Sequence, residues 1–181
     1  MVYFKKSMLS GALALFVYAG VQHCALATGD PVTLNITGTV VATPCEVGED
    51  SVPTTISLNG SENTPLQTAD LNAAGSASDW IPFTVTLKNC PAGTSSVTAT
   101  FVGASDADDP ETLYKNGGDA LNVAVQLEGK AGEPYGNGKT STLQIASNMA
   151  VWELQTRAFT KNGGVTPGEI SAVITMNFEY K

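Results

Sequence analysis

Two short stretches of the sequence carry side chains that could bind an ion or a phosphate group. The segment SDADDPE, residues 105–111, gathers carboxylates of the kind that bind calcium, and GEPYGNGKTST, residues 132–142, runs through a glycine, a lysine and a threonine. The first stretch lacks the D-x-D-x-D-G spacing and the terminal glutamate of an EF-hand loop. The second has Glu133 where a phosphate-binding loop needs its first glycine. We therefore expect a solvated loop at the first stretch and a hairpin turn at the second.

The residue types that usually perform catalysis are scarce. His23 is the only histidine and, with Cys24, lies in an N-terminal segment that we expect to be removed. Most general-base and nucleophilic-triad arrangements are then excluded. Zinc would need more ligands than Cys45 and Cys90 can supply. The sequence therefore predicts a protein that is not an enzyme and has no cofactor, no metal site and no small-molecule substrate.

The first 27 residues have the pattern of a secretory signal peptide. Lys5 and Lys6 precede an apolar run at residues 8–21, and Ala25-Leu26-Ala27 fits the small-x-small cleavage pattern. The 14 residues of the apolar run are too few for a hydrocarbon core of roughly 30 Å, which argues against a transmembrane anchor. We therefore expect residues 1–27 to be removed and the remaining 154 residues to form one exported domain.

The exported chain would be strongly acidic and would carry one disulfide. It keeps seven basic residues against 17 acidic ones, a net charge of −10, and has no basic stripe to meet the phosphates of a nucleic acid. Cys45 and Cys90 can pair in only one way, and an even number of cysteines in an exported protein predicts a disulfide. Closing a loop of about 45 residues would stabilise the fold by roughly 4 kcal/mol.

The body of the chain reads as strands separated by turn signals, with little helical periodicity. Asn59-Gly60, Asn116-Gly117-Gly118 and Asn162-Gly163-Gly164 are such turn signals. This rhythm predicts an all-β fold, an antiparallel sandwich of immunoglobulin-like type. Residues 61–79 show no clear period and are expected to form a long connection with one helical turn. The expected strands are residues 39–43, 54–58, 81–89, 96–103, 120–129, 140–145, 150–159 and 169–180.

The last expected strand indicates that the sandwich is incomplete. Apolar side chains alternate along it up to the last residue but one, whereas an immunoglobulin-type sandwich has a further strand beyond this one. The apolar row would border an open groove with unpaired backbone groups, and such an edge invites a strand from another chain. The row consists of Ile170, Ala172, Ile174, Met176, Phe178 and Tyr180.

A strand that could fill the groove lies near the other end of the sequence, at residues 32–40. One copy of the chain could give this strand to the next copy and receive one from a third, and this head-to-tail contact would generate a fibre because it does not close. A glycine in its apolar row would match a groove site that is too narrow for a side chain. The alternative is that residues 32–43 form an ordinary first strand of their own domain. The row consists of Val32, Leu34, Ile36, Gly38 and Val40.

Several motifs connect these two ends to a known family. Gly168 is the fourteenth residue from the end and Tyr180 the penultimate one. With these two positions, the sequence resembles the pilin subunits of the chaperone–usher pathway over essentially the whole mature chain, and within that family a minor, tip-adaptor subunit. The motifs are GTVVATPCEV (38–47), SASDWIPFTVTLKNCPAGTSSVTATF (76–101), LYKNGG (113–118) and RAFTKNGGVTPGEISAVITMNFEYK (157–181).

The resemblance implies an immunoglobulin-like pilin domain, residues 41–181, that lacks its last strand. A periplasmic PapD-like chaperone would complete it first, and at an outer-membrane usher the N-terminal extension of the next fimbrial subunit would replace the chaperone strand. Residues 28–40 would be this extension, with Val32, Leu34, Ile36, Gly38 and Val40 as donor residues. Gly168 and the apolar row from Ile170 to Tyr180 would form the groove edge, and a basic cleft of the chaperone would hold the Lys181 carboxylate. The protein would reside in a fimbrium at the cell surface, after export through the periplasm, and support adhesion.

Three alternatives remain open from the sequence. The first is the major subunit of the fimbrial shaft. The second is a sugar-binding adhesin that uses Trp80 or Trp152 as a platform, although each tryptophan adjoins a strand pattern and is expected in the core. A two-domain adhesin would also need a lectin domain, for which 154 residues leave no room. The third is a secreted hydrolase, which the missing histidine and the lack of a paired-carboxylate motif oppose.

Overall fold

The structure is a computed structural model that describes residues 34–48, 53, 55–59 and 64–181 of the chain. It falls into two units, Met1–Gly38 and Thr39–Lys181. The expected signal peptide lies outside the described residues, so its removal stays a prediction. The described residues contain no helix, and therefore no helix that could cross a membrane.

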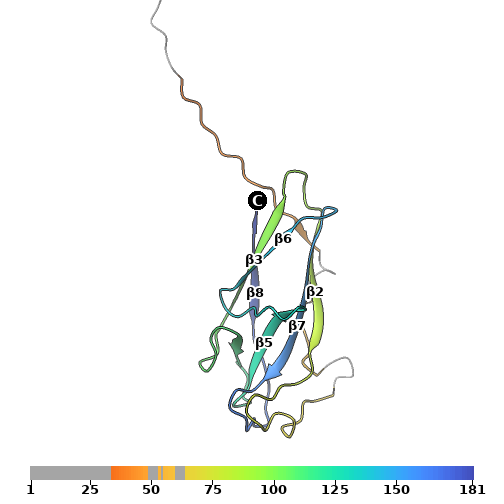
Figure 1. The fold of residues 1–181 in the computed structure, drawn as a ribbon, viewed down its shortest axis with the longest axis vertical. Coiled ribbons are helices and arrows are strands. Elements are labelled where there is room, and N and C mark those ends of the chain that lie inside the picture. The colour runs from red at the N-terminus through yellow and green to blue at the C-terminus, as the bar shows by residue number, and fades with distance from the viewer. Residues whose placement is uncertain (1–33, 49–52, 54, 60–63) are drawn as a thin grey trace, which may run out of the picture. The chain divides into compact units, whose positions relative to one another are not determined.

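The second unit contains two β-sheets, a five-stranded sheet of order β1-β2-β7-β5-β4 and a three-stranded sheet of order β6-β3-β8 (Figure 1). The neighbours in both sheets pair antiparallel. The two sheets face each other, which confirms the predicted immunoglobulin-like sandwich. The strands are β1 (Glu46–Val47), β2 (Ile81–Lys88), β3 (Ser96–Gly103), β4 (Leu113–Lys115), β5 (Ala124–Gly129), β6 (Thr140–Gln144), β7 (Ala150–Phe159) and β8 (Ile174–Tyr180).

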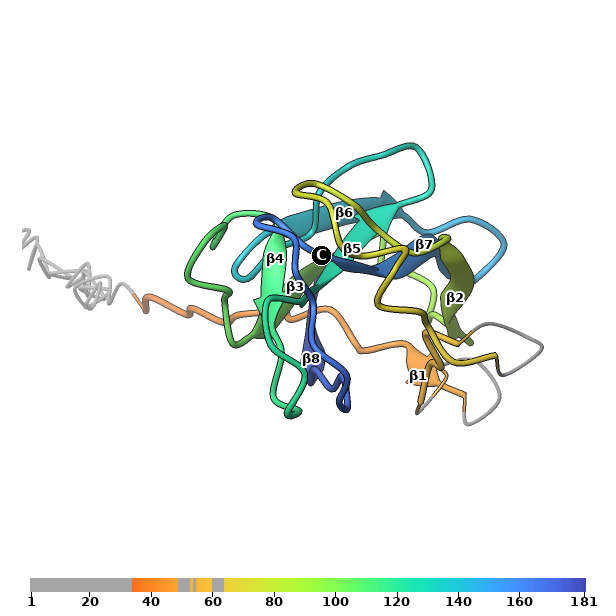
Figure 2. The ribbon, with the colours of Figure 1, turned by 90° about the horizontal axis from the view of Figure 1, so that it is seen from below.

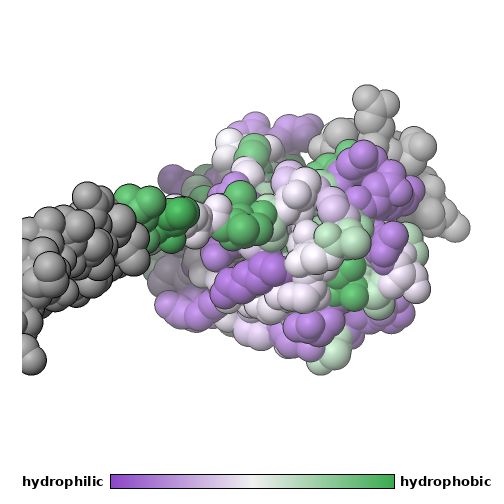
Figure 3. Space-filling view, turned by 90° about the horizontal axis from the view of Figure 1, so that it is seen from above, coloured by the Kyte–Doolittle hydropathy of each residue, from purple (hydrophilic) through white to green (hydrophobic). Residues whose placement is uncertain are grey.

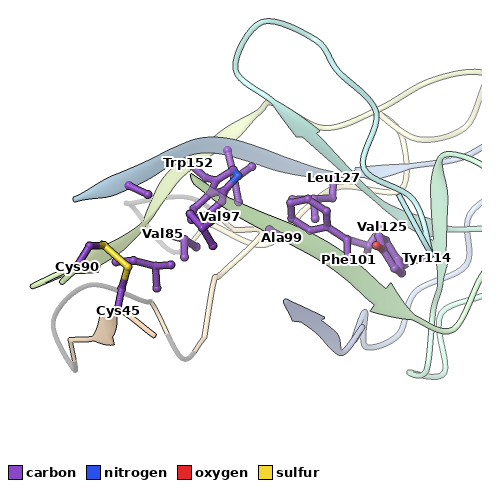
Figure 4. Packing of buried hydrophobic residues seen from close by; sticks show 13 residues of the cluster. Cys45, Val85, Cys90, Val97, Ala99, Phe101, Tyr114, Val125, Leu127 and Trp152 are labelled. Atoms are coloured by element: carbon purple, nitrogen blue, oxygen red, sulfur yellow. A yellow bond between two sulfur atoms is a disulfide. The ribbon is translucent and has the colours of Figure 1, made fainter. Parts of the chain in front are cut away.

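The core lies between the sheets, because every second side chain of a strand points to the same face. On β3, Val97, Ala99 and Phe101 are each 0% exposed. Trp152 of β7 and Leu127 of β5, from the opposite sheet, belong to the same buried cluster. Figure 4 shows the cluster as a row of side chains that follows the length of the sandwich.

The predicted disulfide is present at one end of this row (Figure 4). It joins Cys45, just before β1, to Cys90, just after β2, and both cysteines are buried. Its partners are 45 positions apart in the sequence, so the bond ties the start of the domain to the end of the second strand. The pairing of Cys45 with Cys90 is therefore confirmed.

Two expected strands near the start of the domain are wrong. Residues 39–43 and the described part of 54–58 have no strand pairing, and the first paired residues are Glu46 and Val47, opposite Lys88 and Leu87 of β2. Alternating side chains predict an extended chain, but a strand also needs a neighbour to which its backbone can bond. Residues 39–43 have no such neighbour in the part of the chain that the structure describes.

Two further strands begin later than predicted. β5 begins at Ala124 because Asn122 lies at φ 61°, in the left-handed region that strands do not use. β8 begins at Ile174 because residues 169–171 bond to a loop instead of a strand. In this loop the N–H of Ala120 donates to the Glu169 carbonyl at 3.2 Å, and that of Gly117 donates to the Ser171 carbonyl at 2.7 Å.

The long connection before β2 also differs from the prediction. Its described part, residues 64–79, contains no helical turn. Residues 68–71 form a turn in which the N–H of Leu71 donates to the Thr68 carbonyl at 3.2 Å. The Leu71 side chain is buried in a small second cluster with Ala120, Val123 and Ala158. The connection therefore closes one end of the sandwich as an irregular segment.

Candidate functional site at the open edge of the sandwich

The last strand, β8, lies at an edge of its sheet and pairs only with β3. The side chains at its odd-numbered positions are exposed, while those at its even-numbered positions are partly buried. The same alternation extends back through Ala172 and Ile170. The even-numbered residues pack against the core cluster but are not enclosed by it. The structure thus places the predicted apolar row along one open side of the core.

The backbone of this row is unpaired along the free edge. In an antiparallel ladder, residue pairs that exchange two hydrogen bonds alternate with pairs that exchange none. Lys181 and Ser96 exchange two, at 3.0 and 3.1 Å, so the odd-numbered residues of β8 bond to β3. The N–H and C=O groups of the even-numbered residues therefore point away from β3, and no described residue pairs with them. These residues are Ile174, Met176, Phe178 and Tyr180.

The first strands of the five-stranded sheet, β1 and β2, lie at the edge of that sheet. Figure 2 shows β8 and β1, each at an edge of its own sheet, on the same side of the sandwich. The ring of Phe178 contacts the buried Trp152, with ring centroids 5.4 Å apart. Phe83 of β2 and Leu58 are further partly buried side chains packed on the same cluster. The partly buried side chains next to this edge of the core are therefore hydrophobic and aromatic.

Tyr180 closes one end of the opening against the disulfide segment. Burial raises the pKa of the Tyr180 hydroxyl, and a hydrogen bond with the backbone of Cys45 acts in the opposite direction. On the face of the molecule seen in Figure 3, hydrophobic residues lie among hydrophilic and weakly polar ones. Tyr180 thus lies where β8 and the start of the other sheet come together.

The other end of the opening depends on Gly168. Its φ is 156°, and a Cβ there would lie 2.5 Å from the backbone nitrogen of Ala120. Only glycine fits such a close approach of two backbones. It allows Glu169 to accept from the Ala120 N–H and so fixes the start of the apolar row. The structure gives Gly168 a role in the position of the row.

The described part of the expected donor segment is exposed and unpaired. Val32 lies outside the described residues. Leu34, Ile36 and Val40 are 78, 91 and 99% exposed, and no strand is assigned to residues 34–40. A Cβ added at Gly38 would have no atom within 4 Å, so the conformation described does not itself require a glycine. The assignment of these residues as donors stays a prediction.

The two ion-binding candidates of the sequence have other roles. In the acidic loop, Asp108 accepts hydrogen bonds from the Nζ of Lys161 through its carbonyl and from the Nδ2 of Asn162 through its carboxylate, both at 2.6 Å. The part of the chain that the structure describes has no group of three His, Cys, Asp or Glu side chains that could hold a metal ion. Residues 132–142 contain a turn, in which the N–H of Lys139 donates to the Gly136 carbonyl at 3.1 Å. The stretch does not join two paired strands, because β5 and β6 belong to different sheets.

Of the two tryptophans, only Trp152 is in the core as expected, with 3% of its surface exposed. Trp80 is partly buried at the surface, so its assignment to the core is wrong. The guanidinium of Arg157 covers its ring at 4.1 Å from the centroid. Arg157 Nε also donates to Gln126 Oε1 at 2.8 Å. A side chain of the protein itself therefore already lies on a face of the Trp80 ring.

Sequence reasoning missed one contact at the end of the site. The terminal Lys181 is bound by Ser95 and Ser96, which precede and begin β3. A pair of serines after a turn has no spacing or periodicity that would have singled it out. The contact appears only because β3 and β8 are neighbours in the sheet.

The sequence is similar to that of fimbrial proteins. The profile of the family described as "Fimbrial protein" matches residues 34–181. The chain is 39% identical over 169 residues to Protein FimG of Escherichia coli strain K12, covering 91% of this chain and 95% of FimG. It is 33% identical over 171 residues to the S-fimbrial adhesin protein SfaS of Escherichia coli O6:K15:H31 strain 536, covering 92% of this chain and 97% of SfaS.

Solved structures with a similar fold are pilus subunits. The P pilus rod subunit PapA gives a TM-score of 0.62 at 21% identity, covering 77% of this chain and 100% of PapA. A subunit in a chaperone–usher pilus, from a study of rod uncoiling, gives 0.62 at 20% identity and covers 86% of this chain and 99% of that subunit. At this identity the likeness shows the fold. With the sequence matches, it shows that this chain belongs to the fimbrial protein family, the pilins of the chaperone–usher pathway.

Proposed function

We propose that this protein is a structural subunit that joins others by donor-strand exchange and supports fimbria-mediated adhesion. In this reaction β8 receives an extended strand from another chain, and residues 28–40 serve as the strand that this chain donates. No covalent bond changes. The driving force is the burial of apolar side chains together with the completion of a sheet.

The observation that carries the proposal is the open edge of β8. An edge with unpaired N–H and C=O groups is a template for a further strand. Here the residues with unpaired backbone groups are also those whose side chains line the opening of the core. One added strand would therefore satisfy the hydrogen bonds and cover the apolar surface at the same time.

The exposed segment at residues 34–40 has the pattern that such an edge requires. Leu34, Ile36 and Val40 alternate with polar residues, so all three side chains fit one face of an added strand. Full burial of each contributes about 1.5–3 kcal/mol. Several kcal/mol are thus available from side chains alone, before the backbone bonds are counted.

The same edge defines the expected partners. A periplasmic PapD-like chaperone covers it before assembly, an outer-membrane usher is the place of exchange, and neighbouring fimbrial subunits supply and receive strands. The 39% identity with FimG favours the minor, tip-adaptor kind of subunit, to which the sequence motifs already pointed. The alternative is the major shaft subunit. Immunogold labelling distinguishes the two, because an adaptor labels fibre tips and a shaft subunit labels the whole length.

A peptide displacement experiment tests the exchange. The mature subunit is purified in complex with its chaperone and mixed with a synthetic peptide of residues 28–41. We expect the peptide to release the chaperone, because its apolar row replaces the chaperone strand along β8. Size-exclusion chromatography measures the released chaperone.

Two peptide variants of equal charge provide the control. The first carries Leu34→Asp and Ile36→Asp in the apolar row, and the second carries Asn35→Asp and Thr37→Asp on the opposite face. The first should release at least about tenfold less chaperone than the unchanged peptide, since each buried carboxylate costs several kcal/mol. The second should act nearly like the unchanged peptide. Equal release by both variants would show that the peptide does not insert as a strand with this face inward.

A further inference from the structure

The side chain of Asn116 uses its full hydrogen-bonding capacity near the start of the apolar row. Its Nδ2 donates to the Ala120 carbonyl at 2.8 Å and to the Glu169 carbonyl at 3.3 Å. Its Oδ1 accepts from the N–H of Gly118 at 2.9 Å and from the N–H of Ser171 at 2.8 Å. A side-chain amide has two donors and two acceptor positions, so all four are used. Asn116 thus ties the loop before β5 to the segment before β8.

Asn116 is followed by a glycine, which makes its side chain chemically reactive. The Gly117 nitrogen can attack the side-chain carbonyl carbon of Asn116, because glycine has no side chain to hinder the approach. The new N–C bond closes a succinimide ring, and the side-chain nitrogen leaves as ammonia with the proton of the Gly117 nitrogen. Water then opens the ring to aspartate or isoaspartate. The net reaction consumes one water, releases one ammonia and needs no oxidant or enzyme.

The segment at residues 169–171 blocks this reaction while it is docked. The N–H of Gly117 donates to the Ser171 carbonyl at 2.7 Å, so the attacking nitrogen is held toward Ser171 and not toward the Asn116 side chain. Glu169 and Ser171 are exposed and belong to no strand, and the backbone N–H and C=O of Ile170 have no hydrogen-bond partner among the described residues. Local openings occur in segments of this kind. Asn116 can react when the segment opens.

Asn137 is followed by a glycine as well, but it is protected in a different way. Asn137 Oδ1 accepts from the Gly103 N–H at 3.1 Å, and the Gly138 N–H donates to the Phe101 carbonyl at 2.7 Å. Gly103 and Phe101 belong to β3, which has a strand on each side. The protection of Asn137 therefore depends on a central strand of its sheet and not on residues 169–171.

We propose that Asn116 is a site of spontaneous deamidation, which the docked residues 169–171 protect and whose product displaces the start of the apolar row. An aspartate would direct a charged oxygen at the carbonyl oxygens of Ala120 and Glu169, to which the amide now donates. Isoaspartate would also add one methylene to the backbone. Either product loosens Ile170, whose side chain packs against both buried clusters. The effect on strand binding rests on the proposed function, whereas the reaction itself does not.

Mass spectrometry of the incubated subunit–chaperone complex tests the site. The fractions of aspartate and isoaspartate at Asn116 and Asn137 are followed over time, with the chain unfolded in urea as the reference. In urea the two sites should react at similar rates. In the complex both should react more slowly, and Asn116 should react at least about fivefold faster than Asn137, because a local opening is more frequent than the opening of a central strand. Equal rates at the two sites in the complex, or no protection of Asn116, would overturn the inference.

Gly168→Ala tests the protecting segment. A Cβ at Gly168 would lie 2.5 Å from the backbone nitrogen of Ala120 and would push residues 169–171 away. The reaction should accelerate at least about fivefold at Asn116 and less than twofold at Asn137. The matched control is Gly132→Ala, which also has a positive φ, 92°, but leaves the added Cβ with no atom within 4 Å, so both rates should stay within about twofold. Equal acceleration at both sites by Gly168→Ala, or none, would overturn the inference. If Gly168→Ala forms no complex, the two sites of the native complex decide.

Asn116→Asp reproduces one product and tests its effect on assembly. Surface plasmon resonance measures the dissociation of the subunit from the PapD-like chaperone, which should be at least about tenfold faster than for the native chain because two hydrogen bonds are lost and a charge faces two carbonyls. The control Asn137→Asp makes the same charge change but keeps the oxygen that accepts from Gly103, so dissociation should change less than about twofold.

The rate of deamidation at Asn137 shows whether the sandwich of Asn116→Asp is still folded. Unchanged dissociation, or faster dissociation together with lost protection of Asn137, would overturn the inference, because the product would then either leave the row in place or unfold the whole domain. Failure of the residue 28–41 peptide to release the chaperone from the native complex would instead overturn the proposed function and would leave the deamidation rates as expected.

Discussion

At the scale of single residues, the inward side chains of β8 differ from those of β3 in exposure more than in type. Phe101 on β3 is 0% exposed, whereas Phe178 on β8 remains partly exposed although its ring contacts Trp152. Both residues follow the same alternation along their strands. The difference arises because β3 has a neighbour on each side and β8 has one. Inward side chains that are only partly buried therefore indicate that a strand lacks a neighbour on one side.

The buried Tyr114 gives a test at this scale. Burial raises the pKa of the Tyr114 hydroxyl to about 12, from an ordinary value of 10.0. Between about pH 10 and 12, the Tyr114 hydroxyl therefore keeps its proton in the folded chain but has lost it in the unfolded chain. The protonated Tyr114 hydroxyl contributes to the free energy of unfolding, and this contribution is fully present below about pH 10 and is lost as the pH rises from 10 to 12. We expect a loss of roughly 2–3 kcal/mol over that range. Urea unfolding measures it, on a chain whose residues 28–40 are moved from the N-terminus to a short linker after Lys181.

The control for this prediction is Tyr114→Phe. The Tyr114 hydroxyl donates to the Tyr135 carbonyl at 2.8 Å, so the variant should be less stable than the parent at pH 8. Its free energy of unfolding should nevertheless fall less between pH 10 and 12, because the titrating group is gone. Parallel decreases in the parent and the variant would show that Tyr114 does not cause the pH dependence.

At the scale of elements, the sequence predicted long internal strands well and short or edge elements poorly. The bounds expected for β3 and β7 agree with the structure, because both strands are long and alternate clearly between turn signals. β4 has three residues and β1 two, too few for an alternation to be visible. Residues 39–43 have the right side chains for a strand but no strand partner among the described residues.

The sequence predicted which side chains form the candidate site, but it did not predict all the contacts that these residues make. The even-numbered row from Ile170 to Tyr180 alternates in the structure as the sequence indicated. The sequence could not show that residues 169–171 bond to the loop before β5, nor that Ser95 binds the backbone oxygen of Lys181. These contacts join residues about 50 to 90 positions apart, and local periodicity carries no information about such distances.

Gly38 provides a test of the segment at residues 28–40. Gly38→Leu should leave chaperone binding unchanged, because the structure has open space at this position and the fold does not need a glycine there. It should slow donation to the next subunit at least about tenfold, since a leucine placed in a narrow groove site causes overpacking of 1–3 kcal/mol or more. Native gel electrophoresis of mixed subunits measures the rate at which new subunit pairs form.

The matched change is Thr39→Leu, which places the same side chain on the opposite face of the strand. Subunits with this substitution should donate at close to the unmodified rate. If Gly38→Leu subunits also donate at that rate, the groove has no site that requires a glycine, and the register assigned to the segment is wrong.

At the scale of the whole molecule, the domain is a sandwich with one uncovered side. Two sheets of five and three strands enclose most of the core, and the disulfide fixes one end of the opening. The apolar floor and the unpaired edge of β8 remain accessible. A protein with such a surface is expected to associate or aggregate unless another strand covers it. The alternating segment at residues 32–40 is divided between the two units, whose boundary lies between Gly38 and Thr39.

The central claim is that the domain lacks one strand, and transfer of the donor strand tests it most directly. Residues 28–40 are deleted from the N-terminus and attached after Lys181 through a short flexible linker. The strand is then held near its own groove at a high effective concentration, and no strand remains for donation. Size-exclusion chromatography and differential scanning calorimetry compare this protein with the unmodified mature chain, both without chaperone.

We expect the rearranged protein to be a monomer that unfolds in one cooperative transition, with a midpoint temperature at least about 10 °C above that of the unmodified chain, since several kcal/mol of added stability correspond to such a shift. The unmodified chain should associate or unfold at lower temperature. If the unmodified chain is already a stable monomer, and the transferred strand changes neither its size nor its midpoint temperature, then the fold is complete without a partner and the account is contradicted.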